Sequence, residues 1–209
     1  MSRASLADMT SINSITLEVA EPAAAEKFYS DAFGLGSRLQ FRASDAPTSG
    51  FRGYTISLLT AQPADAGALF DAAIAAGATA LKPISKSIWG VGGSVQAPDG
   101  AIFKFATSSK KDTAPASRKI ESIVVLLAAS DVSASKKFYV ERGFEVGKSF
   151  GSYVDFKLPS SPVGFGLYSR KALAKDAGVP EAGTGSHRIV LISDAGAFAD
   201  PDGYAWEAA

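Results

Sequence analysis

The 209-residue chain has 46% hydrophobic side chains, enough to bury one large core or two smaller ones. Lys and Arg together number 21, as do Asp and Glu, so no overall field favours nucleic acid or an anionic membrane. The absence of cysteine excludes disulfides, thiolate nucleophiles and Cys-ligated metals. No stretch approaches the roughly eighteen apolar residues of a membrane span, and Met1–Asn13 lacks a signal-peptide pattern. We therefore expect a cytoplasmic protein without nucleic-acid or membrane partners.

The first half of the chain alternates between strand and helix patterns. Pro22 suits the first turn of a helix, and Gly34 suits its left-handed end. The apolar spacing predicts strands at Ile12–Val19, Leu35–Phe41, Gly53–Leu59 and Ala78–Ile84, helices at Pro22–Phe33 and Pro63–Ala76, and a loop over 43–50.

Two similar hairpins are predicted about a hundred residues apart, at Val95–Phe105 and Phe198–Glu207. Each contains Pro-Asp-Gly, a tight-turn sequence followed by an alternating strand pattern. The second strand places Lys104 and Glu207 at equivalent positions. The glycine-rich Trp89–Gly93 segment is interpreted as a flexible approach to the first hairpin.

The polar stretch over residues 108–119 has no apolar periodicity and predicts a solvated linker between domains at residues 1–107 and 120–209. After it the chain begins again, with Asp131 as a helix cap and Phe138-Tyr139 at an offset of 110 from Phe28-Tyr29. The second half predicts strands at Ile120–Ala129, Gly143–Phe150, Tyr153–Leu158, Val163–Tyr168 and His187–Ser193, and helices at Val132–Arg142 and Ser169–Ala177.

A strand, an acidic residue, a helix with Phe-Tyr and a closing Asp-Pro-Asp-Gly-x-x-Trp-Glu follow one another here. This order resembles the vicinal oxygen chelate superfamily, which includes glyoxalase I, bleomycin-resistance proteins and extradiol dioxygenases. The resemblance covers nearly the whole chain as two degenerate copies. It implies an α+β fold of two tandem glyoxalase-like βαβββ-type domains, whose curved mixed sheets enclose a cavity.

The metal-dependent members of this superfamily take ligands from three strand positions. Carried over to this sequence, these positions hold Ser14, Tyr54 or Thr55, and Lys104 in the first copy, and Val124, His187 and Glu207 in the second. Only His187 and Glu207 fit the pattern, whereas a catalytic divalent ion generally needs three protein ligands. The ammonium of Lys104 would repel a cation.

A ligand-binding cavity is the alternative to a metal centre. If the family fold holds, its lining includes Tyr54, Trp89, Phe103, Lys104, Tyr168, His187, Trp206 and Glu207. The competing interpretation is structural: the rings pack in the core or at an interface, His187 pairs with a nearby carbonyl or carboxylate, and Glu207 is solvated or paired with an arginine.

Three functional hypotheses follow. The leading one is a bleomycin-resistance-like protein that binds a small planar or anionic organic molecule without a metal and is not an enzyme. The alternative is a metal-dependent lyase, isomerase or dioxygenase that uses His187, Glu207 and a divalent ion. The third is a structural protein without a ligand. The sequence allows a monomer or a homodimer.

Overall fold

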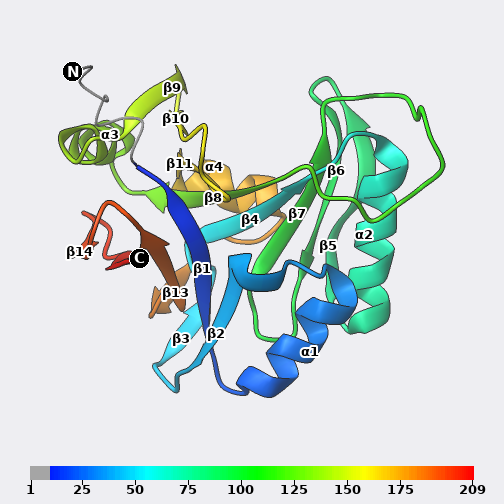
Figure 1. The fold of residues 1–209 in the computed structure, drawn as a ribbon, viewed down its shortest axis with the longest axis horizontal. Helices are drawn as coiled ribbons and strands as arrows, with labels where there is room; N and C mark the ends of the chain where they lie inside the picture. The colour runs from blue at the N-terminus through cyan, green and yellow to red at the C-terminus, as the bar shows by residue number, and fades with distance from the viewer. Residues whose placement is uncertain (1–9) are drawn as a thin grey trace, which may run out of the picture.

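A computed structural model describes residues 10–209 as an α+β fold, as the sequence predicts (Figure 1). The first nine residues, and with them most of the Met1–Asn13 segment that lacks a signal-peptide pattern, lie outside the described part. No helix of residues 10–209 is long and apolar enough to cross a membrane. The helices are α1 (Pro22–Ala32), α2 (Pro63–Ala76), α3 (Val132–Glu141) and α4 (Arg170–Ala177).

The larger sheet has eight strands in the order β5-β6-β7-β4-β8-β11-β10-β9. Strands β4 and β8 pair antiparallel at its centre, and each also pairs parallel with the last strand of its own βαβββ unit. These strands are β4 (Tyr54–Leu59), β5 (Thr79–Ser87), β6 (Gly90–Gln96), β7 (Ile102–Thr107), β8 (Ser122–Ala129), β9 (Glu145–Phe150), β10 (Tyr153–Lys157) and β11 (Gly164–Ser169).

The smaller sheet has five strands in the order β14-β15-β13-β1-β2 and combines the start of the chain with its end. Its central pair, β1 with β13, is antiparallel, as is the central pair of the larger sheet. These strands are β1 (Ile12–Val19), β2 (Leu39–Ala43), β13 (Ile189–Ser193), β14 (Phe198–Ala199) and β15 (Ala205–Ala208). Each sheet therefore takes strands from both sides of residues 108–119.

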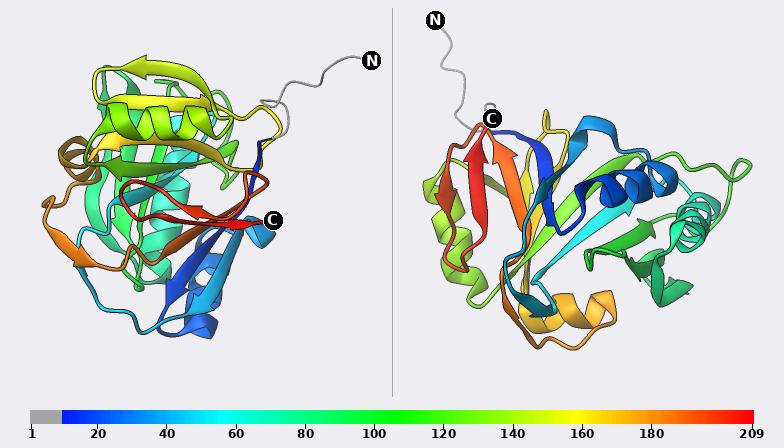
Figure 2. Two further views of the ribbon diagram at one scale, coloured as in Figure 1. Left: turned by 90° about the vertical axis from the view of Figure 1, so that its left-hand side faces the viewer. Right: turned by 90° about the horizontal axis from the view of Figure 1, so that it is seen from below.

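The main core lies where the smaller sheet and helices α1, α2 and α3 meet one face of the larger sheet (Figure 2). Alternate residues of each strand enter this core, as the period of two requires. In β8, Ile123, Val125 and Leu127 face it, whereas Leu126 and Ala128 belong to a second cluster on the opposite face. The second cluster contains α4, which lies apart from α1 and α2 in the right-hand view of Figure 2.

The predicted caps and hairpins agree with the structure. Asp131 accepts a hydrogen bond from the Ala134 amide (3.0 Å) and so caps α3, and Gly34 adopts a left-handed φ of 63° after α1. The hairpins are formed by β6 with β7 and by β14 with β15. The structure also shows that the repeat is incomplete. The unit that begins with β1 lacks a strand pair, and the unit that begins with β13 lacks a helix.

Three local predictions are wrong. The segment after Trp89 is not a flexible approach, because Gly90, Gly92 and Gly93 lie within β6; a Cβ at any of them would collide with a neighbouring carbonyl oxygen. The predicted loop over 43–50 contains β3 (Thr48–Gly50), which pairs with β12 (Gly183–Gly185). Part of the strand predicted from Leu35 is a 3-10 turn at Gly36–Arg38.

The segment over residues 108–119 is largely exposed and irregular, and α2 anchors it. The side chain of Gln62 accepts hydrogen bonds from the amides of Thr113 (2.8 Å) and Ala114 (2.9 Å). The Asp65 carboxylate accepts one from the Ser117 amide (2.7 Å). Burial alone would raise the pKa of Asp65, but hydrogen bonds from Gln62 and Ser117 outweigh it and hold that pKa below its ordinary value.

Asp65→Ala is therefore expected to release this segment from α2. Limited trypsin digestion should cleave after Lys110, Lys111 and Arg118 several times faster than in the unmodified protein, because the anchored backbone becomes free. Asp71→Ala, which removes an exposed carboxylate from the same helix, is the matched control. Equal cleavage rates in the two variants would contradict the anchoring role of Asp65.

Candidate functional site

The open face of the larger sheet, defined here by Thr55, Ser94, Lys104, Leu126 and Ala128, lies opposite the main core. Helix α4 covers part of it, and its Leu173, Ala174 and Ala177 are buried there. The small side chains of Ala174 and Ala177 allow the helix to approach the sheet closely.

Helix α4 is held at both ends. The Ser169 hydroxyl accepts a hydrogen bond from the Ala172 amide (3.4 Å), and Gly178 ends the helix in the left-handed conformation. The open face supplies two donors to its last turn: Ser94 Oγ donates to the Ala177 carbonyl (2.7 Å), and Lys82 Nζ donates to the Lys175 carbonyl (2.8 Å). Helix α4 is thus fixed to the sheet by polar as well as apolar contacts.

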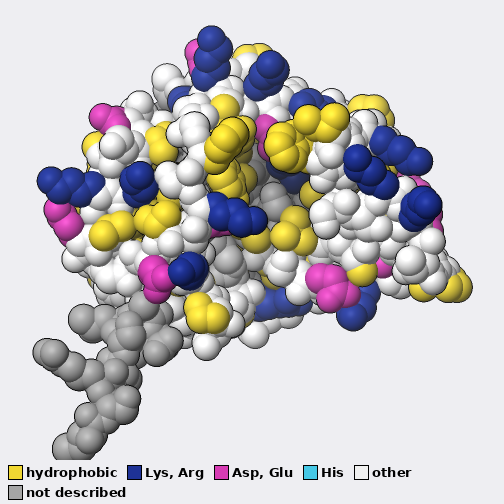
Figure 3. Space-filling view, turned by 90° about the horizontal axis from the view of Figure 1, so that it is seen from above, with side chains coloured by type: hydrophobic (Ala, Val, Ile, Leu, Met, Phe, Trp, Pro, Cys, Tyr) yellow, Lys and Arg dark blue, Asp and Glu magenta, His cyan; other side chains and the backbone are white. Residues whose placement is uncertain are grey.

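A cavity of about 470 Å³ lies beside α4 and contains two of the predicted site residues, Trp89 and Lys104. Trp89 is 80% exposed at the tip of the β5–β6 hairpin. The Lys104 ammonium is paired with the Asp176 carboxylate from α4, and their side chains are 18% and 39% exposed. Figure 3 shows a hollow between groups of hydrophobic side chains on the face that carries the upper ends of β6 and β9 in Figure 1.

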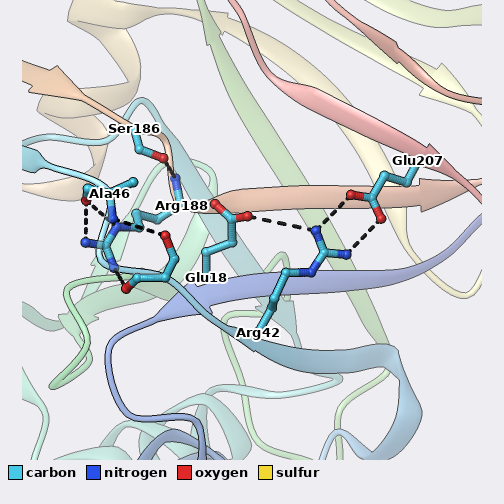
Figure 4. Close-up of polar contacts among 7 residues, drawn as sticks. Glu18, Arg42, Ala46, Ser186, Arg188 and Glu207 are labelled. Atoms are coloured by element: carbon cyan, nitrogen blue, oxygen red, sulfur yellow. Dashed lines mark hydrogen bonds and ion pairs between the residues drawn. The ribbon is translucent and has the colours of Figure 1, made fainter.

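The smaller sheet carries its own polar cluster on the face that points away from the core (Figure 4). Arg42 of β2 donates from Nη1 and Nη2 to the two carboxylate oxygens of Glu207, each at 2.8 Å. Its Nη1 also lies 3.9 Å from a carboxylate oxygen of Glu18 on β1. The pKa of Glu207 is lowered by the hydrogen bonds from Arg42, which favour the charged carboxylate. Both oxygens of Glu207 are therefore engaged by a guanidinium.

His187 lies outside the strand that the sequence predicts for it, since β13 begins at Ile189 and Arg188 has a positive φ of 57°. Its Nδ1 faces the carbonyl oxygen of Arg52 (2.7 Å), and its Nε2 faces that of Asp202 (3.0 Å). The ring stacks on Tyr204 with centroids 3.9 Å apart. Both ring nitrogens thus point to backbone carbonyls, and neither is free to coordinate a metal.

The described residues do not fit the divalent metal that the resemblance implies for metal-dependent members. Glu207 pairs with Ile192 in the β13–β15 ladder and is bound by Arg42, whereas His187 precedes the start of β13 and faces backbone carbonyls. In the first copy, the ligand position on the final strand is occupied by the ammonium of Lys104, which is paired with Asp176. No group of three or more His, Cys, Asp or Glu side chains within residues 10–209 is placed to hold a metal ion.

The remaining predicted site residues lie in separate places. Phe103 and Trp206 are buried in the main core, and the Tyr168 ring packs edge-on against Tyr153. Tyr54 lines a different cavity from Trp89 and Lys104. Of the eight residues, the structure thus brings only Trp89 and Lys104 together at one cavity, within the part of the chain that it describes.

Sequence reasoning missed Asp176 and Arg42, the partners of Lys104 and Glu207. An exposed arginine on a strand, or an aspartate at the end of a short helix, gives no local sign of its partner. Their ion pairs join residues 72 and 165 positions apart.

The architecture is similar to the fold of solved glyoxalase I structures, and this similarity confirms the fold that the sequence resemblance predicts. A mutant of glyoxalase I from Zea mays is similar with a TM-score of 0.64 and 14% identity, over 95% of this chain and 92% of that one. A Bacillus subtilis protein provisionally named a dioxygenase has a TM-score of 0.57 and 13% identity, over 89% and 71% of the two chains. No family model matches the sequence, and no curated protein does.

Proposed function

We propose that the protein binds a small, planar, anionic organic molecule in the cavity beside α4, without a metal. The observation that carries this proposal is the exposed indole of Trp89 at the rim of a cavity that also contains the largely buried ammonium of Lys104. When a flat ligand covers a large aromatic ring that is exposed to water, the burial of apolar surface lowers the free energy of the complex. The rest of the lining combines apolar residues such as Val91 with hydroxyl-bearing ones such as Thr60, and a directed charge in a mixed cavity of this kind can orient a small molecule.

In the free protein, Asp176 neutralises Lys104. The Asp176 side chain is the more exposed of the pair and lies at the end of an eight-residue helix, so it can turn into water at little cost. Lys104 is more buried and retains the need for a counterion. An anionic ligand would therefore take the place of the Asp176 carboxylate.

This competition leads to opposite effects for two substitutions. Asp176→Asn is expected to tighten the binding of an anionic ligand about two- to fivefold, because the internal competitor loses its charge. Lys104→Met should weaken binding about ten- to hundredfold, because a charged hydrogen bond is lost. Isothermal titration with aromatic carboxylates selected in a thermal-shift screen measures both effects.

Three controls complete the design. Asp71→Asn and Lys136→Met make the same charge changes on α2 and α3 and should leave affinity unchanged. Trp89→Phe should abolish the ligand-induced change in tryptophan fluorescence, since Trp206 is buried in the core. If no carboxylate binds, or if both charge variants weaken binding, the proposed site is wrong. A stoichiometric divalent ion in the purified protein would instead favour the metal-dependent enzyme.

A further inference from the structure

A second cavity, of about 270 Å³, lies where the residues before β4 meet the β6–β7 turn and the segment after α4. Its walls are mainly apolar and include Phe51, Ile102 and Val179. Arg52 is the only charged side chain among the described residues that line it, and Gln96 adds an amide. A cavity with one cation and apolar walls is suited to an organic anion with a single charge.

The polar groups of this cavity are not fully used by the protein. The Arg52 guanidinium offers five N–H donors, and within residues 10–209 one hydrogen bond from it is found, to the Asp99 carbonyl (2.7 Å). Tyr54 is 2% exposed, and its hydroxyl lies beside the Arg52 guanidinium without a hydrogen bond of normal geometry to any described residue. A buried hydroxyl without a partner costs free energy, which an acceptor on a ligand would recover.

The backbone around Arg52 is held in place before any ligand arrives. Its carbonyl accepts a hydrogen bond from His187 Nδ1 (2.7 Å) when that nitrogen carries the proton. The neighbouring Gly53 carbonyl accepts one from the Tyr204 hydroxyl (2.5 Å), and the Phe51 carbonyl accepts one from Arg170 (2.6 Å). A guanidinium on a fixed backbone loses less conformational entropy when it binds an anion.

A larger groove of about 740 Å³ between α1 and α2 also includes Arg52 in its lining. The lining of that groove holds three acidic side chains, Glu21, Asp31 and Asp99, and three basic ones, Lys27, Arg52 and Arg188, so its charges balance. The smaller cavity, in contrast, has an unbalanced positive charge among its described lining residues, that of Arg52. Its volume corresponds to roughly nine water molecules at about 30 Å³ each.

We infer that this smaller cavity is a second binding site, for a small apolar carboxylate that pairs with Arg52 and accepts a hydrogen bond from Tyr54. The site is separate from the cavity beside α4, and its occupation does not depend on the function proposed there. Benzoate has the required charge and size, and benzamide is its neutral counterpart.

The experiment measures benzoate binding by ligand-observed NMR in the full-length protein carrying Lys104→Met, which silences the other proposed site. Adding Arg52→Met should weaken benzoate binding about ten- to hundredfold, and adding Tyr54→Phe about tenfold. Adding Arg38→Met, the matched loss of an arginine outside this cavity, should leave binding unchanged. Benzamide should bind at least tenfold more weakly than benzoate.

Folding is checked separately by the midpoint of thermal unfolding. Tyr54→Phe removes a hydroxyl without a partner, so its midpoint should be no lower than that of the parent. Equal benzoate affinity in the Arg52→Met and Arg38→Met variants would overturn the inference, as would equal affinity for benzoate and benzamide. Loss of binding through Lys104→Met alone would likewise assign benzoate to the cavity beside α4.

Discussion

Tyr139→Ala is expected to lower the free energy of unfolding by about 3–5 kcal/mol, the cost of removing a large aromatic side chain from a core. The ring is fully buried and packs edge-on against Phe144 and Phe165, with centroids 5.4 and 4.8 Å away. Its hydroxyl donates to the Asp200 carboxylate (2.7 Å) and accepts from Trp206 Nε1 (3.2 Å). Urea denaturation followed by far-UV circular dichroism measures the loss.

One further variant separates the contribution of the Tyr139 ring from that of its hydroxyl, and a second is a surface control. Tyr139→Phe keeps the ring and should cost about 1–3 kcal/mol, because Asp200 and Trp206 lose a buried partner. Phe150→Ala removes an aromatic ring that is 81% exposed and should change stability by less than about 0.5 kcal/mol. If Tyr139→Ala and Phe150→Ala were equally stable, Tyr139 would have no role in the core.

The same network predicts a dependence of stability on pH. Burial raises the pKa of Asp200, and hydrogen bonds from Tyr139, Asp202 and Tyr204 offset this only in part. Between the ordinary pKa of aspartate and this raised value, the folded chain holds a proton that the unfolded chain releases, so stability falls as pH rises. The stability of the unmodified protein relative to Asp200→Asn should therefore decline from pH 4 towards neutrality. Urea titrations at several pH values measure it, and a rise would contradict the prediction.

Leu173→Ala is expected to cost about 2–5 kcal/mol and to loosen α4 from the open face. Leu173 is fully buried against this face, and an eight-residue helix is too short to be stable without packing. Hydrogen exchange should show lost amide protection over residues 170–177, while the central strands β4 and β8 remain protected.

Lys171→Ala is the matched control, because this side chain is exposed on the same helix. It should leave both stability and exchange close to those of the unmodified protein. Unchanged exchange in α4 of the Leu173→Ala variant would contradict the view that packing on the open face holds the helix.

Much of this fold can be predicted from local patterns. The Pro-Asp-Gly turns, the Phe-Tyr helices and the alternating strands depend on residues close in sequence, so their positions agree with the structure to within a few residues. The hydrogen bonds between tyrosine and aspartate show where prediction from local patterns ends. Tyr139 pairs with Asp200, the first acid of its turn sequence, whereas Tyr29 pairs with Asp99, which aligns with Asp202.

The pairing of strands from the two sides of residues 108–119 is not encoded in any local pattern. Periodicity determines which face of β1 is buried, but the pairing of Ile15 with Leu191 depends on contacts that form only in the assembled chain. The position of α4 on the open face has the same origin. Arg52 and Tyr54 line the second cavity together with Val179, and no local sequence pattern predicts that these residues meet.

The pairing of β1 with β13 and β2, visible in Figure 1, has a consequence during synthesis on the ribosome. Strand β2, one partner of β1, follows it closely in the chain, but residues 54–169, which contain every strand of the larger sheet, emerge before its other partner, β13, exists. The edge of β1 that pairs with β13 must therefore stay open until residues 189–193 have been made. A nascent chain that stops before Ile189 would expose the apolar edge of Ile12–Val19 and would be a target for chaperones or for aggregation.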